Sequence, residues 1–162
     1  MWSIVKNAIA LVVSAVSIGC DKPTIGDLAD AKSLFEANLR DFHTVAELLE
    51  QNRSIPFVQK TMSGARLSEI FGAKMDAAAS RAYDRTVSFL QTSGVQRIKI
   101  YRELDEEGKP DDTIAFSLSS YFEPGGRDGG TMIFKSTDDI IAIYGPDCIR
   151  LDTMRWYACY IP

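Results

Sequence analysis

The sequence has 162 residues and a formal net charge of −4 at pH 7, with 46% hydrophobic and 25% charged residues. These proportions are ordinary for a globular protein, and the length suits one domain with a single core. No run of Lys and Arg is present, which argues against a nucleic-acid-binding protein. A mildly acidic chain also suits a basic protein partner better than an anionic lipid surface.

The N-terminal segment has the pattern of a secretory signal. Lys6 precedes an uncharged, mostly apolar run over residues 8–19, which matches the positive and apolar regions of a signal peptide. The run is shorter than the roughly 20 apolar residues that a membrane-spanning helix needs. An uncleaved membrane anchor and ordinary secretion are the alternatives to a cleaved lipoprotein signal.

The apolar run ends in VSIGC, residues 16–20, a segment that resembles the lipobox of bacterial lipoproteins. This resemblance implies that residues 1–19 are removed and that Cys20 becomes the lipidated N-terminus. We then expect residues 20–27 to be a lipidated tether and residues 28–162 to be one globular domain facing the periplasm. Asp21 favours the inner membrane in enterobacterial lipoproteins, but the sequence leaves inner and outer membrane both open.

The other two cysteines, Cys148 and Cys159, are candidates for a disulfide. An even pair of cysteines in an oxidising compartment commonly pairs, whereas two free thiols would fit a chain that stays in the cytoplasm. If residues 152–155 form a four-residue hairpin loop, Leu151 faces Trp156 and Cys148 faces Cys159. The spacing therefore predicts a disulfide across an antiparallel hairpin.

The first half of the mature chain has helical periodicity. Apolar residues recur every seven positions from Leu28 to Leu49, which predicts one long helix over residues 27–51. We expect this helix to pack on its own domain, with a coiled-coil partner as the alternative. A connection over residues 52–64, a short helix over residues 65–71 and a helix over residues 74–92 ending at Gly94 follow.

The pattern then changes to the alternation that is typical of half-buried strands. We expect strands at residues 97–101, 113–122, 131–135 and 140–144, and then the hairpin that carries Cys148 and Cys159. Helices first and strands second predict the α+β class. The N-terminal helices should pack on one face of a C-terminal antiparallel sheet of about four or five strands, with the other face in solvent.

The search for catalytic chemistry gives no site. His43 is the only histidine, it lies beside the apolar stripe of the long helix, and no G-x-S-x-G motif is present. One histidine and a disulfide leave too few ligands for an ordinary zinc site, and the acidic stretches do not match a calcium-binding loop. We therefore expect no catalytic residue, no metal and no cofactor.

Two surfaces are candidates for contact with a partner. One is the glycine-rich segment over residues 123–130, which we expect to be an exposed loop that presents Arg127 and Asp128, or else a simple connection of small residues. The other is the outward face of the sheet, which is either a recognition surface or an ordinary solvated face. The residues predicted on that face are Arg97, Lys99, Tyr101, Thr113, Ser117, Ser119, Tyr121 and Tyr157.

These observations predict a non-catalytic, lipid-anchored protein-binding module in the cell envelope. By analogy with other small acidic lipoproteins, we expect an immunity or inhibitor protein against a toxin or a cell-wall-degrading enzyme. An accessory subunit of an envelope assembly or secretion complex is one alternative, and an enzyme with an unrecognised site is the other.

Overall fold

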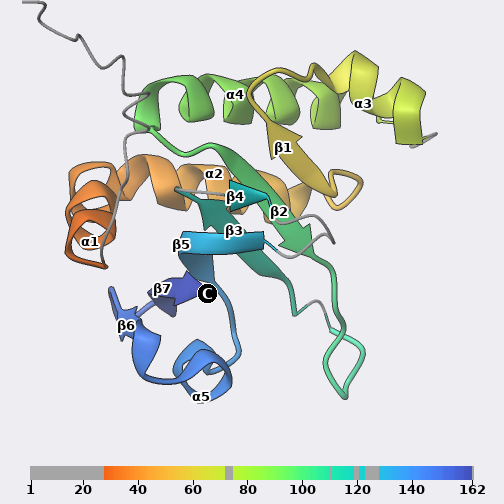
Figure 1. The fold of residues 1–162 in the computed structure, drawn as a ribbon. Coiled ribbons are helices and arrows are strands. Elements are labelled where there is room, and N and C mark those ends of the chain that lie inside the picture. The colour runs from red at the N-terminus through yellow and green to blue at the C-terminus, as the bar shows by residue number, and fades with distance from the viewer. Residues whose placement is uncertain (1–27, 72–74, 110, 119–120, 123–127, 162) are drawn as a thin grey trace, which may run out of the picture.

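The computed structural model describes residues 28–71, 75–109, 111–118, 121–122 and 128–161 (Figure 1). The helices are α1 (Leu28–Ala37), α2 (Leu39–Gln51), α3 (Gly64–Phe71), α4 (Ala77–Ser93), α5 (Ile140–Tyr144) and the short 3-10 helix η1 (Gly145–Asp147). The strands are β1 (Phe57–Gln59), β2 (Arg97–Tyr101), β3 (Thr113–Ser117), β4 (Tyr121–Phe122), β5 (Asp128–Lys135), β6 (Cys148–Arg150) and β7 (Trp156–Ile161).

The strands form an antiparallel sheet in the order β1-β2-β3-β5-β7-β6, and β4 pairs with β5 off this path. Helices α1, α2 and α4 cover one face of the sheet, which we call the helical face (Figure 1). The expected α+β class, with helices preceding the sheet and packed on one face, is confirmed. The sheet has more strands than expected because β1 lies in the segment predicted as a connection, and because the strand predicted over residues 113–122 is two strands, β3 and β4.

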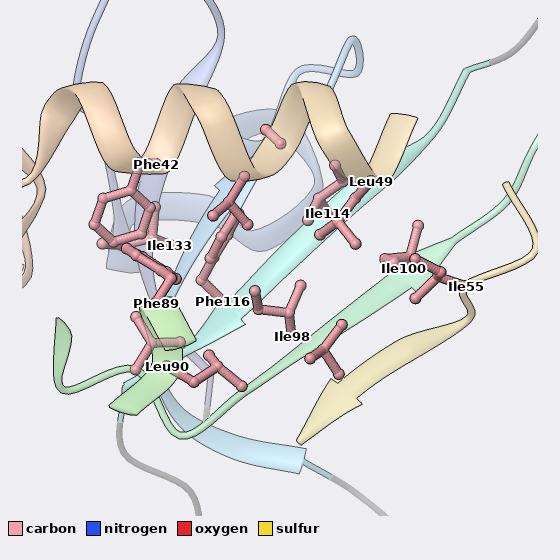
Figure 2. Close-up of a cluster of buried hydrophobic side chains, with 14 of the residues drawn as sticks. Phe42, Leu49, Ile55, Phe89, Leu90, Ile98, Ile100, Ile114, Phe116 and Ile133 are labelled. Atoms are coloured by element: carbon pink, nitrogen blue, oxygen red, sulfur yellow. The ribbon is translucent and has the colours of Figure 1, made fainter. Parts of the chain in front are cut away.

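The main hydrophobic core lies between the helices and the helical face (Figure 2). The ring of Phe42 from α2 lies 5.2 Å from that of Phe89 in α4 and 5.1 Å from that of Phe116 in β3, both in edge-on geometry. Aromatic pairs in this arrangement add to the stabilisation from burial. Ile98, Ile114 and other β-branched residues complete the core from the strands, where such side chains pack well.

The prediction of a single helix over residues 27–51 is wrong, because α1 and α2 are separate helices that meet at Asn38. The Asn38 amide donates to the Leu34 carbonyl at 2.9 Å, and its backbone leaves the helical conformation with φ −123° and ψ 24°. Asparagine side chains compete with the helix for backbone groups in this way. The bend directs Phe35 and Phe42 to the same ring, Trp156, with centroids 5.1 and 5.9 Å away.

The ends of α4 follow from two residues. The Asp76 carboxylate accepts a hydrogen bond from the Ala79 N–H at 2.8 Å and caps the first turn. Gly94 ends the helix with φ 81°, in the left-handed region that glycine tolerates. The expected end at Gly94 is therefore confirmed, as is the short helix over residues 65–71, which is α3.

The opposite side of the sheet, which we call the far face, carries a second hydrophobic cluster and the helix α5. A strand was expected at residues 140–144, and this prediction is wrong. The Asp139 carboxylate accepts hydrogen bonds from the N–H groups of Ile141 and Ala142, which starts a helix instead. The buried residues of the cluster are Ala115, Met132, Phe134, Ile140, Cys148, Tyr157 and Cys159.

Candidate functional site

A disulfide joins Cys148 of β6 to Cys159 of β7, as the hairpin spacing predicts. The two residues are directly opposed in the register, and their Cα atoms are 4.1 Å apart. Both side chains are buried in the second cluster. The disulfide therefore fastens the edge strand β6 to its neighbour on the far face, the side on which α5 packs.

The loop of this hairpin is held to α2. One oxygen of the Asp152 carboxylate accepts hydrogen bonds from the N–H groups of Met154 and Trp156 at 2.8 and 3.2 Å. The other oxygen lies 3.6 Å from Nε2 of His43, whose half-buried ring is 5.3 Å from that of Trp156. His43 and Asp152 thus connect α2 to the β6–β7 loop.

Three predicted contact residues, Arg97, Lys99 and Tyr101, alternate along β2 on the far face. Lys99 is exposed, and its Nζ lies 5.1 Å from the centroid of the Tyr101 ring. Tyr101 is 40% exposed. A cation held against an exposed aromatic ring is a favourable arrangement at a surface.

A groove of about 350 Å³ runs beside these residues along β1 and β2. Phe57 and Gln59 of β1 lie directly opposite Lys99 and Arg97 in the register, and all four residues line the groove. The groove therefore combines apolar side chains, among them Phe57, with the amide of Gln59 and the two cations of β2.

Helix α5 adds a second tyrosine to this region. The ring of Tyr144 stacks on that of Phe134 with centroids 5.6 Å apart, and the residue is still 43% exposed. Burial raises the pKa of Tyr144 above its ordinary value of 10, and the neighbouring phenol of Tyr101 raises it further. Arg97, Lys99, Tyr101 and Tyr144 thus form one region, which we call the α5–β2 surface.

Sequence reasoning missed Tyr144 because the segment was read as a strand. The available signal was the Asp138-Asp139 pair, which is compatible with either a turn or a helix start. In the structure Asp139 caps α5, and this cap determines where Tyr144 lies.

Two residues predicted on the outward face of the sheet, Ser117 and Tyr157, are buried, so the prediction that they are exposed there is wrong. Ser117 is on the far face but only 2% exposed, because β3 is an interior strand and the longer side chains of Arg97 and Met132 flank it. Tyr157 is buried in the second cluster with Ile140 of α5. The expectation of a fully solvated far face fails for the same reason.

The strand that follows the glycine-rich segment begins earlier than expected. Asp128 is the first residue of β5 and pairs with Phe122, while Tyr121 of β4 pairs with Gly129. Residues 128–130 therefore belong to a strand. Cys20, Ser119 and Arg127 lie outside the described residues.

A buried ionic cluster also escaped the sequence analysis. The Asp112 carboxylate, 4% exposed, accepts hydrogen bonds from Arg102 at 2.5 Å and from Arg53 at 2.8 Å. Arg102 also donates through Nη2 to the carbonyls of Leu49 and Asn52 at the end of α2 and to that of Ile55 in the segment that follows. These contacts are internal to the domain, so we assign the cluster a structural role.

Among the residues that the structure describes, no helix has the length and apolar character to cross a membrane. Within the same residues, no three His, Cys, Asp or Glu side chains gather closely enough to hold a metal ion. No family model, curated protein or solved structure matches the chain.

Proposed function

We propose that this protein is a lipid-anchored, non-catalytic binding module that acts in the cell envelope as an immunity or inhibitor protein. The observation that carries the proposal is the α5–β2 surface, where two tyrosines are exposed and two cations, Arg97 and Lys99, line a groove. Tyr and Arg are enriched at protein interfaces because they combine a large apolar area with polar groups that make specific hydrogen bonds to the partner.

The rigidity of this surface favours binding. Tyr101 stands on β2, which is paired on both sides, and Tyr144 stands on a helix that the second cluster holds to the sheet. Side chains that are already ordered lose little conformational entropy when a partner binds. An inhibitor acts by covering the active site of its target, and a toxin or a cell-wall-degrading enzyme is the proposed target.

The proposed location rests on the N-terminal signal pattern and on the VSIGC segment. The disulfide supports it, because disulfides persist in oxidising compartments such as the bacterial periplasm. Acylation of Cys20 by two or more chains would hold the domain stably at the membrane.

Affinity capture from envelope and secreted fractions tests the proposal. The full chain, in a nonionic detergent and with its disulfide formed, is expected to retain one enzyme or toxin whose activity is lost on binding. Tyr101→Ala should weaken binding at least tenfold, which corresponds to about 1.4 kcal/mol. Tyr160→Ala is the matched control, because Tyr160 of β7 is 42% exposed but lies outside the α5–β2 surface.

The melting temperature of each variant separates a contact role from a structural one. We expect Tyr101→Ala to lower affinity while its melting temperature stays close to that of Tyr160→Ala. Recovery of several envelope subunits with no inhibited activity would contradict the inhibitor proposal and would support an accessory subunit of an assembly.

A further inference from the structure

A second pocket, of about 290 Å³, lies between α5 and the β6–β7 hairpin. Arg150 of β6 and Arg155 of the hairpin loop both line it. The Arg150 guanidinium lies 5.7 Å from the centroid of the Tyr157 ring, and Arg155 donates from Nη1 to the Thr137 carbonyl. Two guanidinium groups are therefore held at the wall of one cavity.

Neither of these arginines makes an ion pair with a carboxylate of the described residues. Arg53 and Arg102, by contrast, share Asp112. The one carboxylate that lines the pocket belongs to Asp139, and its Oδ1 already accepts the two N–H groups that begin α5. Two cations and one anion leave the pocket with an excess of one positive charge.

The backbone of Arg155 gives an independent indication that its side chain is used. Arg155 has φ +63°, and no other non-glycine residue of the described chain has a positive φ. Glycine is the residue that this conformation favours, because it has no Cβ. Non-glycine residues adopt this conformation in turns and at functional positions, and here it places a long cation at the wall of a cavity.

We propose that the Arg150–Arg155 pocket binds a single carboxylate, supplied by an acidic side chain of the partner protein. Guanidinium groups donate pairs of hydrogen bonds that match the two oxygens of a carboxylate. The net charge of one suits a monoanion, and the Asp139 carboxylate opposes a dianion such as phosphate. The chain as a whole is acidic and suggests a basic partner, whereas this pocket requires an acidic group at one point of the interface.

The source of the carboxylate rests on the proposed function, but the pocket itself is testable without a partner. The full chain, labelled with ¹⁵N-arginine and purified in a nonionic detergent, is titrated with N-acetylglutamate amide at constant ionic strength. The arginine Nε–Hε resonances report binding. N-acetylglutamine amide, which has the same shape without the charge, is the ligand control, and inorganic phosphate is the competing anion.

We expect the resonances of Arg150 and Arg155 to shift saturably with one common dissociation constant, in the millimolar range. The resonance of Arg81, an exposed residue of α4, should change only with ionic strength and therefore stay constant in this titration. Arg155→Gly should abolish the saturable shift of the Arg150 resonance, and glycine is chosen because it tolerates the positive φ. Arg81→Gln also removes one positive charge and should leave the shift of the Arg150 resonance unchanged.

Shifts at Arg150 and Arg155 no larger than that at Arg81 would overturn the proposal. Saturation by phosphate at a lower concentration than by N-acetylglutamate amide would overturn its choice of a carboxylate. If a captured target binds Arg155→Gly as tightly as the original chain, the partner does not supply the carboxylate. That result would contradict the proposed contact and leave the proposed function intact.

Discussion

The guanidinium of Arg102 is shared between the carboxylate of Asp112, 2.5 Å away, and backbone carbonyls at the end of α2. Arg102 follows β2 and Asp112 precedes β3, so one side chain attaches the β2–β3 connection to the helix layer. The last carbonyls of a helix have no partner within the helix, and Arg102 supplies a donor to them. This relationship makes Arg102 a strong determinant of stability.

We expect Arg102→Gln to lower the free energy of unfolding by about 3 kcal/mol, because Asp112 would remain buried without its main partner. Urea unfolding followed by tryptophan fluorescence measures the change. Arg66→Gln is the control, since the Arg66 side chain forms an exposed pair with Glu69 at 3.9 Å and its loss should cost less than about 0.5 kcal/mol. Equal losses in the two variants would contradict the structural role of Arg102.

The disulfide should contribute about 3 kcal/mol to the free energy of unfolding, because it closes a short loop and restricts the unfolded chain. Replacing both Cys148 and Cys159 with Ala should remove this contribution. Denaturant unfolding with and without a reductant provides the measurement. A reductant should destabilise the original chain and leave the double variant unchanged, and a similar response in both would show that the bond contributes nothing.

The positive φ of Arg155 predicts an unusual order of stability for two substitutions. Arg155→Ala removes the hydrogen bond to Thr137 and keeps the strained backbone, whereas Arg155→Gly removes both. We expect Arg155→Gly to be more stable than Arg155→Ala by about 1 kcal/mol. Thermal unfolding of the two variants tests this difference, and the reverse order would show that the loop does not hold Arg155 in the left-handed region.

Stability should fall at alkaline pH because of the buried phenol of Tyr83. Burial raises its pKa above the ordinary value of 10, a hydrogen bond from the Gln59 N–H lowers it in part, and Asp84 raises it. The unfolded state therefore releases this proton first, so the contribution is complete below pH 10 and is lost as the pH rises through the pKa of the folded state. Urea midpoints between pH 8 and pH 11.5 should fall less steeply in Tyr83→Phe.

The periodicity of the sequence predicts much of the domain, because the side chains that face the core are apolar and recur with the period of the helix or strand. Apolar residues of α2 and α4 recur at helical spacing, and Ile98 and Ile100 alternate along β2. The spacing of apolar residues within each of these elements therefore indicates which of its faces is buried. The disulfide is predictable for a similar reason, since its register depends only on the length of one loop.

The errors have two causes, a local side-chain cap that the apolar pattern does not report and a distant element that covers part of a face. Residues 140–144 are apolar and β-branched in the manner of a strand, and only the cap by Asp139 makes them a helix. Once α5 is present, Tyr157 becomes buried and Tyr144 becomes part of the α5–β2 surface. No local pattern reports how much of a sheet face another element covers, so the exposed residues of the site could be predicted only in part.

The contacts of Trp156 also set the order in which the chain can fold. The apolar faces of α1 and α2 are completed by the ring of Trp156, which lies against Phe35 and Phe42. These helices are synthesised well before β7, and until β7 arrives their aromatic side chains have no partner ring from that strand. The core around Trp156 is therefore completed only after β7 has been synthesised.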